Sequence, residues 1–214
     1  MSKTKVIISE QDLIDLIKKA ISKTGIDKLF RSDNEKEKSK KGPKYNTAGE
    51  FRHLDLKNPK DYNLYKEIAN QFIQSRPSNL LQLTGSMFAS AAKKAFDKYG
   101  KYVPIELSMG QLAAEGGFSD NPNARPIKTK NPYNVGNVDS GKNVSHRSVQ
   151  QGIDAYYDLI ARDYLTAGKT ASDLVKNFVN KENLRYASNT TYEQIVRKIA
   201  DQVKRLSDKL HSSQ

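Results

Sequence analysis

The stretch GQLAAEGGF, residues 110–118, places a carboxylate at the end of an apolar segment and directly before two glycines. Pro104 and the spacing of the apolar side chains after it predict a helix that ends near Glu115. The last turn of a helix carries unpaired carbonyl groups that favour cations, so helix stability alone does not explain a glutamate there. The two glycines end the helix and leave room beside the carboxylate. We therefore expect Glu115 at the edge of an opening, with Gln111, one turn earlier, beside it.

A carboxylic acid in this position is suited to general acid catalysis. To protonate a glycosidic oxygen it must keep its proton near neutral pH, and both an apolar site and the negative end of a helix raise its pKa. A second carboxylate commonly assists in such reactions. Asp139 is the first candidate for that second group and Asp120 the next. Turn chemistry for the aspartates and a solvated helix end for Glu115 are the alternative interpretations.

The composition bounds the kind of site. The chain has no cysteine, which excludes disulfides and thiolate ligands, and its three histidines, His53, His146 and His211, are far apart in the sequence. We therefore expect no metal and no cofactor. The formal net charge of +12 predicts attraction to polyanions, among which charge alone does not choose. A nucleic-acid binder is one rival, although that role leaves Glu115 unexplained.

The chain divides into two parts by its pattern. Residues 1–50 combine an amphipathic helix, predicted over residues 9–23, with a lysine-rich linker, and we interpret them as a docking arm. Residues 51–214 follow a helical pattern nearly throughout, with no strand of ordinary length. The exception is residues 116–147, rich in Gly, Pro and Asn, where a loop or a small hairpin around Asp139 is expected.

Two further helices are expected after this loop. Tyr156, Tyr157 and Tyr164 share one face of the first, a stripe that is typical of a core. Thr190 and Glu193 fit a capping box at the start of the second.

Four segments follow one another along the chain: QLAAEGGFS, NPYNVGNVDSG (131–141), VQQGIDAYYDLIARDYL (149–165) and LRYASNTTYEQIVRKIADQV (184–203). In their order and spacing they resemble the N-acetylglucosaminidases of bacterial autolysins, flagellar rod hydrolases and phage virions. The resemblance covers roughly residues 80–205, and its strength lies in the series, because each motif alone is weak.

The resemblance implies a mainly α, lysozyme-like helical domain over residues 51–214, with a small β-hairpin or loop beside a cleft. It implies hydrolysis of the β-1,4 glycan strands of peptidoglycan, with Glu115 as the general acid. Asp139 would then position water, or the substrate's own 2-acetamido group would attack. The residues expected to bind the sugar are Gln111, Phe118, Asn131, Tyr133, Asn134, Tyr156 and Tyr186.

The sequence departs from the family at several positions. Gly116 stands where serine is usual, Phe118 where tryptophan is common, and Asn189 and Thr191 replace an aspartate and a proline. These departures keep two alternatives open. One is a related lytic transglycosylase, and the other is a non-catalytic virion structural or wall-binding protein with the same fold.

The expected partner is bacterial peptidoglycan. No signal peptide and no membrane-spanning run is evident in the sequence, which favours a phage-encoded protein that is carried in the virion or released to the cell wall. In the virion version, residues 1–50 would dock on a structural protein of the phage.

Overall fold

The computed structural model describes residues 51–137, 141, 143–165 and 168–212. The expected docking arm, residues 1–50, and the candidate Asp139 lie outside these described residues. Within them the fold is mainly helical, as predicted. Their β structure is limited to one isolated bridge between Val179 and Arg185.

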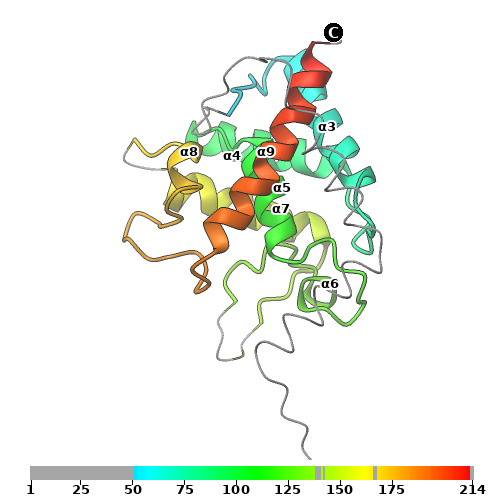
Figure 1. The fold of residues 1–214 in the computed structure, drawn as a ribbon, viewed down its shortest axis with the longest axis vertical. Coiled ribbons are helices and arrows are strands. Elements are labelled where there is room, and N and C mark those ends of the chain that lie inside the picture. Colours follow the sequence, from blue (N-terminus) through cyan, green and yellow to red (C-terminus); the bar gives the residue numbers. More distant parts are fainter. Residues whose placement is uncertain (1–50, 138–140, 142, 166–167, 213–214) are drawn as a thin grey trace, which may run out of the picture. The chain divides into compact units, whose positions relative to one another are not determined.

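The helices follow one another along the chain as shown in Figure 1. Their bounds are α3 Pro59–Gln74, α4 Gly85–Tyr99, α5 Ile105–Ala114, α6 Arg125–Thr129, α7 Val149–Leu159, the π-helical turn η1 Ile160–Tyr164, α8 Ala171–Leu174 and α9 Tyr192–His211.

Helix α5 is the centre of the fold. Its residues from Ile105 to Leu112 are all buried, which is the pattern of a helix surrounded by protein on every side. The long helix α9 crosses α5 in Figure 1 and packs closely against it. Gly110 makes this approach feasible, because a Cβ there would lie 2.7 Å from the Val196 carbonyl oxygen. The end of α5 is thereby held rigidly by its neighbours.

The core beneath this helix is rich in tyrosine hydroxyls that are hydrogen-bonded. Tyr133 and Tyr156 stack with ring centroids 3.6 Å apart. The Tyr157 hydroxyl donates to Ser108 Oγ at 2.7 Å, and Tyr65 and Tyr157 share a hydrogen bond of 2.7 Å. Buried hydroxyls are tolerated here because each has a partner. The core interpretation of Tyr157 is confirmed by its zero exposure.

The loop between α6 and α7 is pinned by one buried amide and contains no strand in its described residues. Asn131 Nδ2 donates to the carbonyl oxygens of Val135 at 2.9 Å and Val144 at 3.2 Å. Its Oδ1 accepts from Val135 N at 3.0 Å. Of the two expected forms, hairpin or loop, the described part is therefore a loop.

The predicted capping box at Thr190 and Glu193 is wrong. Helix α9 begins at Tyr192, without a side-chain cap. The Glu193 carboxylate instead accepts from Phe178 N at 3.1 Å and pairs with Arg185 at 2.8 Å. The Glu193 carboxylate therefore binds residues of the loop before α9 and does not cap the N-terminus of the helix, as the local pattern had predicted.

Candidate functional site

Glu115 lies on the wall of a pocket of about 530 Å³, a volume within the usual range for small-molecule sites. Three segments of the chain build this pocket: the end of α5, the region of α6 and the turn after it, and the loop that leads into α9. The lining residues are Ala114, Glu115, Arg125, Asn134, Asn137, Tyr186, Ala187, Ser188, Asn189 and Tyr192.

The end of α5 places Glu115 as the sequence predicts. Glu115 is the C-cap residue, and its backbone N–H donates to the Gln111 carbonyl oxygen at 2.8 Å. Gly116 follows with φ of +79°, a left-handed conformation that favours glycine. A Cβ at Gly116 would meet only Pro126 Cγ, at 3.9 Å, so the space beside the carboxylate is open.

Asn134 holds the Glu115 carboxylate in place. Its Nδ2 donates to Glu115 Oε2 at 3.0 Å and to the Glu115 carbonyl oxygen at 3.1 Å. Its Oδ1 accepts from Arg125 Nε at 3.1 Å and from Asn137 Nδ2 at 3.0 Å. Both donors and the acceptor oxygen are thus in use, which fixes the orientation of the amide. Asn134 also has φ of +53°, a conformation that asparagine tolerates better than most residues.

A buried relay of hydrogen bonds supports Glu115 from the other side. The Tyr156 hydroxyl donates to Gln111 Oε1, and Gln111 Nε2 donates to the Tyr192 hydroxyl at 3.0 Å. Because the Tyr192 oxygen accepts from Gln111, its own proton is available to Glu115. A hydrogen bond between Tyr192 and Glu115 lowers the pKa of that carboxyl.

The pKa of Glu115 is nevertheless raised above its ordinary value. Burial is the largest cause, and it outweighs the hydrogen bonds from Asn134 and Tyr192 and the positive charge of Arg125, which lower the pKa. A carboxyl that keeps its proton to higher pH and lines an open pocket has the two properties that a general acid needs.

Two tyrosine rings also line the pocket. Tyr186 and Tyr192 stack with ring centroids 5.8 Å apart and an interplanar angle of 17°. The Tyr186 hydroxyl donates to the Tyr133 carbonyl oxygen at 2.8 Å, which ties the wall to the turn that carries Asn134. Tyr186 and Asn134 both line the pocket, and their contact with a sugar stays a prediction.

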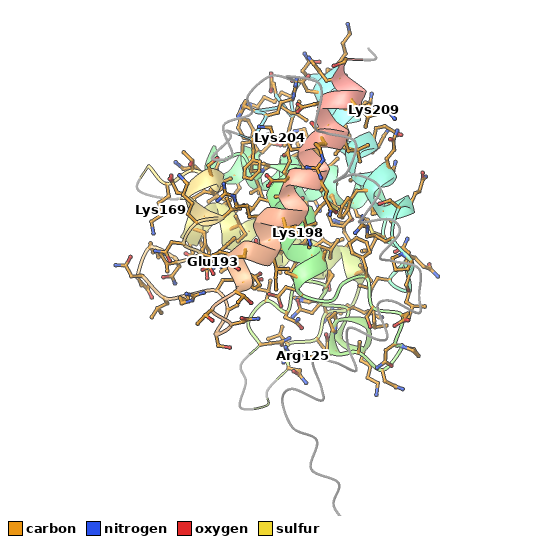
Figure 2. The ribbon with its side chains drawn as sticks, viewed as in Figure 1. Arg125, Lys169, Glu193, Lys198, Lys204 and Lys209 are labelled. Atoms are coloured by element: carbon orange, nitrogen blue, oxygen red, sulfur yellow. The ribbon has the colours of Figure 1, made fainter. Side chains whose placement is uncertain are left out.

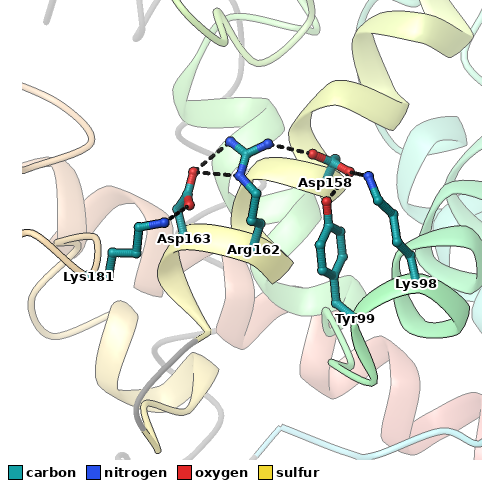
Figure 3. Close-up of polar contacts among 6 residues, drawn as sticks. All are labelled: Lys98, Tyr99, Asp158, Arg162, Asp163 and Lys181. Carbon is teal, nitrogen blue, oxygen red and sulfur yellow. Dashed lines mark hydrogen bonds and ion pairs between the residues drawn. The ribbon is translucent and has the colours of Figure 1, made fainter.

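The loop that carries Tyr186 is anchored by charges at its far end (Figure 3). Lys181 N donates to the Asp163 carbonyl oxygen at 2.8 Å, and its Nζ pairs with Asp163 Oδ1 at 2.9 Å. Asp163 also pairs with Arg162 at 2.6 Å, which bridges to Asp158 on α7 at 2.8 Å. The pairing with Arg162 is the main reason that the pKa of Asp163 falls to about 2. The pocket wall is thus fastened to the helical body.

Other predicted sugar-binding residues do not reach the pocket, which corrects the expectation that they contact substrate. Four have no exposed surface and act as supports, because their side chains are packed in the core: Gln111, Asn131, Tyr133 and Tyr156. Phe118 packs edge to face on Phe72, with ring centroids 5.9 Å apart, and is not part of the pocket lining. Asp120 is exposed and also outside the lining.

Sequence reasoning missed several lining residues. Arg125, Asn137 and Ser188 lie in segments without helical periodicity, so no local pattern singled them out. Tyr192 is the first residue of α9, and this position brings its hydroxyl to Glu115.

A second buried carboxyl, Glu106, lies in the first turn of α5. Among the described residues, neither of its carboxylate oxygens has a hydrogen-bond partner with normal geometry. Burial raises the pKa of Glu106 to about 7. Glu106 is 1% exposed and lines none of the described pockets, so it offers no access to a substrate.

No family model, curated protein or solved structure matches the chain. In the part of the chain that the structure describes, no cluster of three or more His, Cys, Asp or Glu side chains could bind a metal. None of the described helices is both long enough and apolar enough to cross a membrane. The interpretation of the pocket therefore depends on its own geometry and on the series of motifs.

Proposed function

We propose that this protein hydrolyses the β-1,4 glycan strands of peptidoglycan, with Glu115 as the general acid. The observation that carries the proposal is the setting of Glu115: it lines an open pocket, its pKa is raised by burial, and Asn134 fixes one of its oxygens. The motif series supplies the class of substrate, and the pocket supplies a group that can do the chemistry.

The reaction follows from these parts. Glu115 donates its proton to the glycosidic oxygen, the bond between that oxygen and the anomeric carbon breaks, and positive charge develops on the sugar. Water, positioned by Asp139 or following attack by the sugar's 2-acetamido group, adds to the anomeric carbon and gives up a proton that restores Glu115. The partly exposed ring of Tyr186 provides a surface against which a sugar ring can pack.

The test compares the purified protein with Glu115→Gln on isolated peptidoglycan, with the released fragments identified by mass spectrometry. Glu115→Gln keeps the shape of the side chain and removes the transferable proton, so release should fall by about a hundredfold or more. Glu182→Gln is the matched control, because Glu182 is an exposed carboxylate in the loop before Tyr186 and lies outside the pocket.

The products separate the proposal from its rivals. Fragments that carry one added water and that depend on Glu115 support hydrolysis, whereas anhydro fragments identify a lytic transglycosylase. If both proteins sediment with the wall and neither releases fragments, the domain is a wall-binding or structural protein. Undiminished release by Glu115→Gln would refute the role of this residue.

A further inference from the structure

Arg125 is the cation of the pocket lining, where Glu115 is the acid. It is exposed, and it belongs to the short helix α6, beside the turn that carries Asn134. Figure 2 shows Arg125 near the loops at the lower end of the molecule, well away from Lys198, Lys204 and Lys209, which follow α9. Arg125 is therefore separate from the lysines that lie along α9, and among the residues that line the pocket it supplies the positive charge.

Among the residues that the structure describes, the Arg125 guanidinium donates one hydrogen bond, from its Nε to Asn134 Oδ1 at 3.1 Å. It forms no ion pair with a described residue. Its positive charge nevertheless lowers the pKa of Glu115. A guanidinium carries five N–H donors in a planar fork, and the terminal nitrogens of that fork match the two oxygens of a carboxylate.

A neutral glycan gives this cation nothing to pair with, whereas peptidoglycan carries carboxylates. They occur on the lactyl ether of every second sugar once the peptide is removed, and on the stem peptide while it is attached. We propose that Arg125 binds a carboxylate of the glycan substrate, so that the pocket prefers an anionic glycan to a neutral one. This inference rests on the proposed function, because it names what the same pocket recognises.

The alternative role for Arg125 is to orient Asn134 and, through it, Glu115. Two substitutions separate the roles. Arg125→Gln removes the charge, whereas Arg125→Lys keeps the charge and loses the planar fork and the Nε donor. Lys128→Gln is the matched control, because it removes a positive charge from the same helix at an exposed position outside the pocket lining.

Binding is measured in the Glu115→Gln background, so that the glycan is not consumed. The probes are peptide-free glycan fragments with free lactyl carboxylates, the same fragments with the carboxylates converted to amides, and peptide-bearing fragments. We expect Arg125→Gln to weaken binding of a carboxylate-bearing probe by about tenfold, the lower range for a charge-assisted hydrogen bond at an exposed site. Binding of the amidated fragments should stay unchanged. Arg125→Lys, which keeps the charge and loses the fork, should retain part of the affinity. Lys128→Gln should have no effect.

The pattern across probes identifies the source of the carboxylate. An effect on the peptide-free fragments assigns it to the lactyl ether, and an effect confined to peptide-bearing fragments assigns it to the stem peptide. Equal losses on charged and amidated probes, or no loss on any, would overturn the inference.

Cleavage of the same probes by the protein with Glu115 intact distinguishes the role of Arg125 from the proposed hydrolase activity. Carboxylate-dependent binding without cleavage supports the role of Arg125 and refutes the hydrolase activity. Cleavage that is the same with Arg125→Gln and on amidated glycan leaves the hydrolase and removes the role of Arg125. Absence of binding to every probe, together with absence of cleavage by the protein with Glu115 intact, overturns both.

Discussion

Glu106 and Glu115 lie at opposite ends of α5, and burial raises the pKa of both, yet only one of them faces a pocket. Glu115 has Asn134 on its carboxylate and open space beside it. Glu106 is buried, and neither of its carboxylate oxygens has a partner with normal hydrogen-bond geometry in the described part of the chain. The carboxyl with the larger pKa shift is therefore the one that no substrate can reach.

The helix acts on the two groups in opposite directions. Its N-terminal end favours a negative charge, and its C-terminal end disfavours one. Glu106 is thus held protonated by burial in spite of the helix, whereas at Glu115 burial and the helix end act together. A perturbed pKa marks a functional candidate only when access and oriented partners accompany it.

The largest effect that we predict is a pH dependence of the free energy of unfolding that is caused by Glu106. The pKa is about 7 in the folded protein, against an ordinary 4.5, so the folded state holds the proton more tightly. The contribution of Glu106 to stability is therefore fully present below pH 4.5 and is lost as the pH rises through about 7. The loss amounts to about 3 kcal/mol from this group at higher pH. Glu106→Gln, which imitates the protonated form, should remove this fall in denaturant unfolding measured between pH 4.5 and 8.

Other charged groups also act on the pKa of Glu106. Arg52 and Lys204 lower its pKa, and Asp208 raises it. Tyr102 and Tyr157 also adjoin it, and their pKa values are raised mainly by burial.

Folded Glu106→Gln should cleave peptidoglycan within about twofold of the unchanged protein, because Glu106 lies outside the pocket. A large loss of cleavage by a folded variant would break the distinction between the two carboxyls.

A feature of this site could be predicted from the sequence where neighbouring residues determine it, and could not where it depends on residues far apart in the chain. The end of α5 at Glu115 depends on local residues, namely the glycines that follow it, and the sequence was sufficient there. The partners of Glu115 come from the chain beyond it: Asn134 is 19 residues away, and the contact between Gln111 and Tyr192 spans 81 residues. No periodicity encodes such pairings. For the same reason Gln111 and Tyr156 were expected in the pocket, whereas helix packing buries them beneath it.

A smaller effect is expected when Glu115 loses its amide partner and so becomes more like Glu106. Asn134→Gly removes both donors to Glu115 and keeps the left-handed backbone, which glycine adopts freely. We expect cleavage at acidic pH to fall by about tenfold as the proton donor loses its fixed orientation. Because the Asn134 hydrogen bond lowers the pKa of Glu115, the basic limb of the pH–rate profile should move to higher pH.

Gly136 offers the backbone control for this variant. It lies in the same turn with φ of +72° and takes no part in the contacts to Glu115. Gly136→Asn should place asparagine in the left-handed region at some cost in stability and leave the position of the basic limb unchanged. A basic limb that stays in place in Asn134→Gly would show that the amide does not act on Glu115.

The smallest effect is expected at Tyr192, on the other side of Glu115. Tyr192→Phe removes the acceptor of Gln111 Nε2, which is fully buried, and should destabilise the fold by about 1 kcal/mol. It also removes a hydrogen bond that lowers the pKa of Glu115, so the basic limb should again rise. Tyr99→Phe, which loses a hydroxyl contact to Asp158 away from the pocket, is the matched control and should leave the pH profile unchanged. If Tyr192→Phe lowers stability without moving the limb, the relay from Tyr156 through Gln111 is structural and Glu115 depends on Asn134 alone.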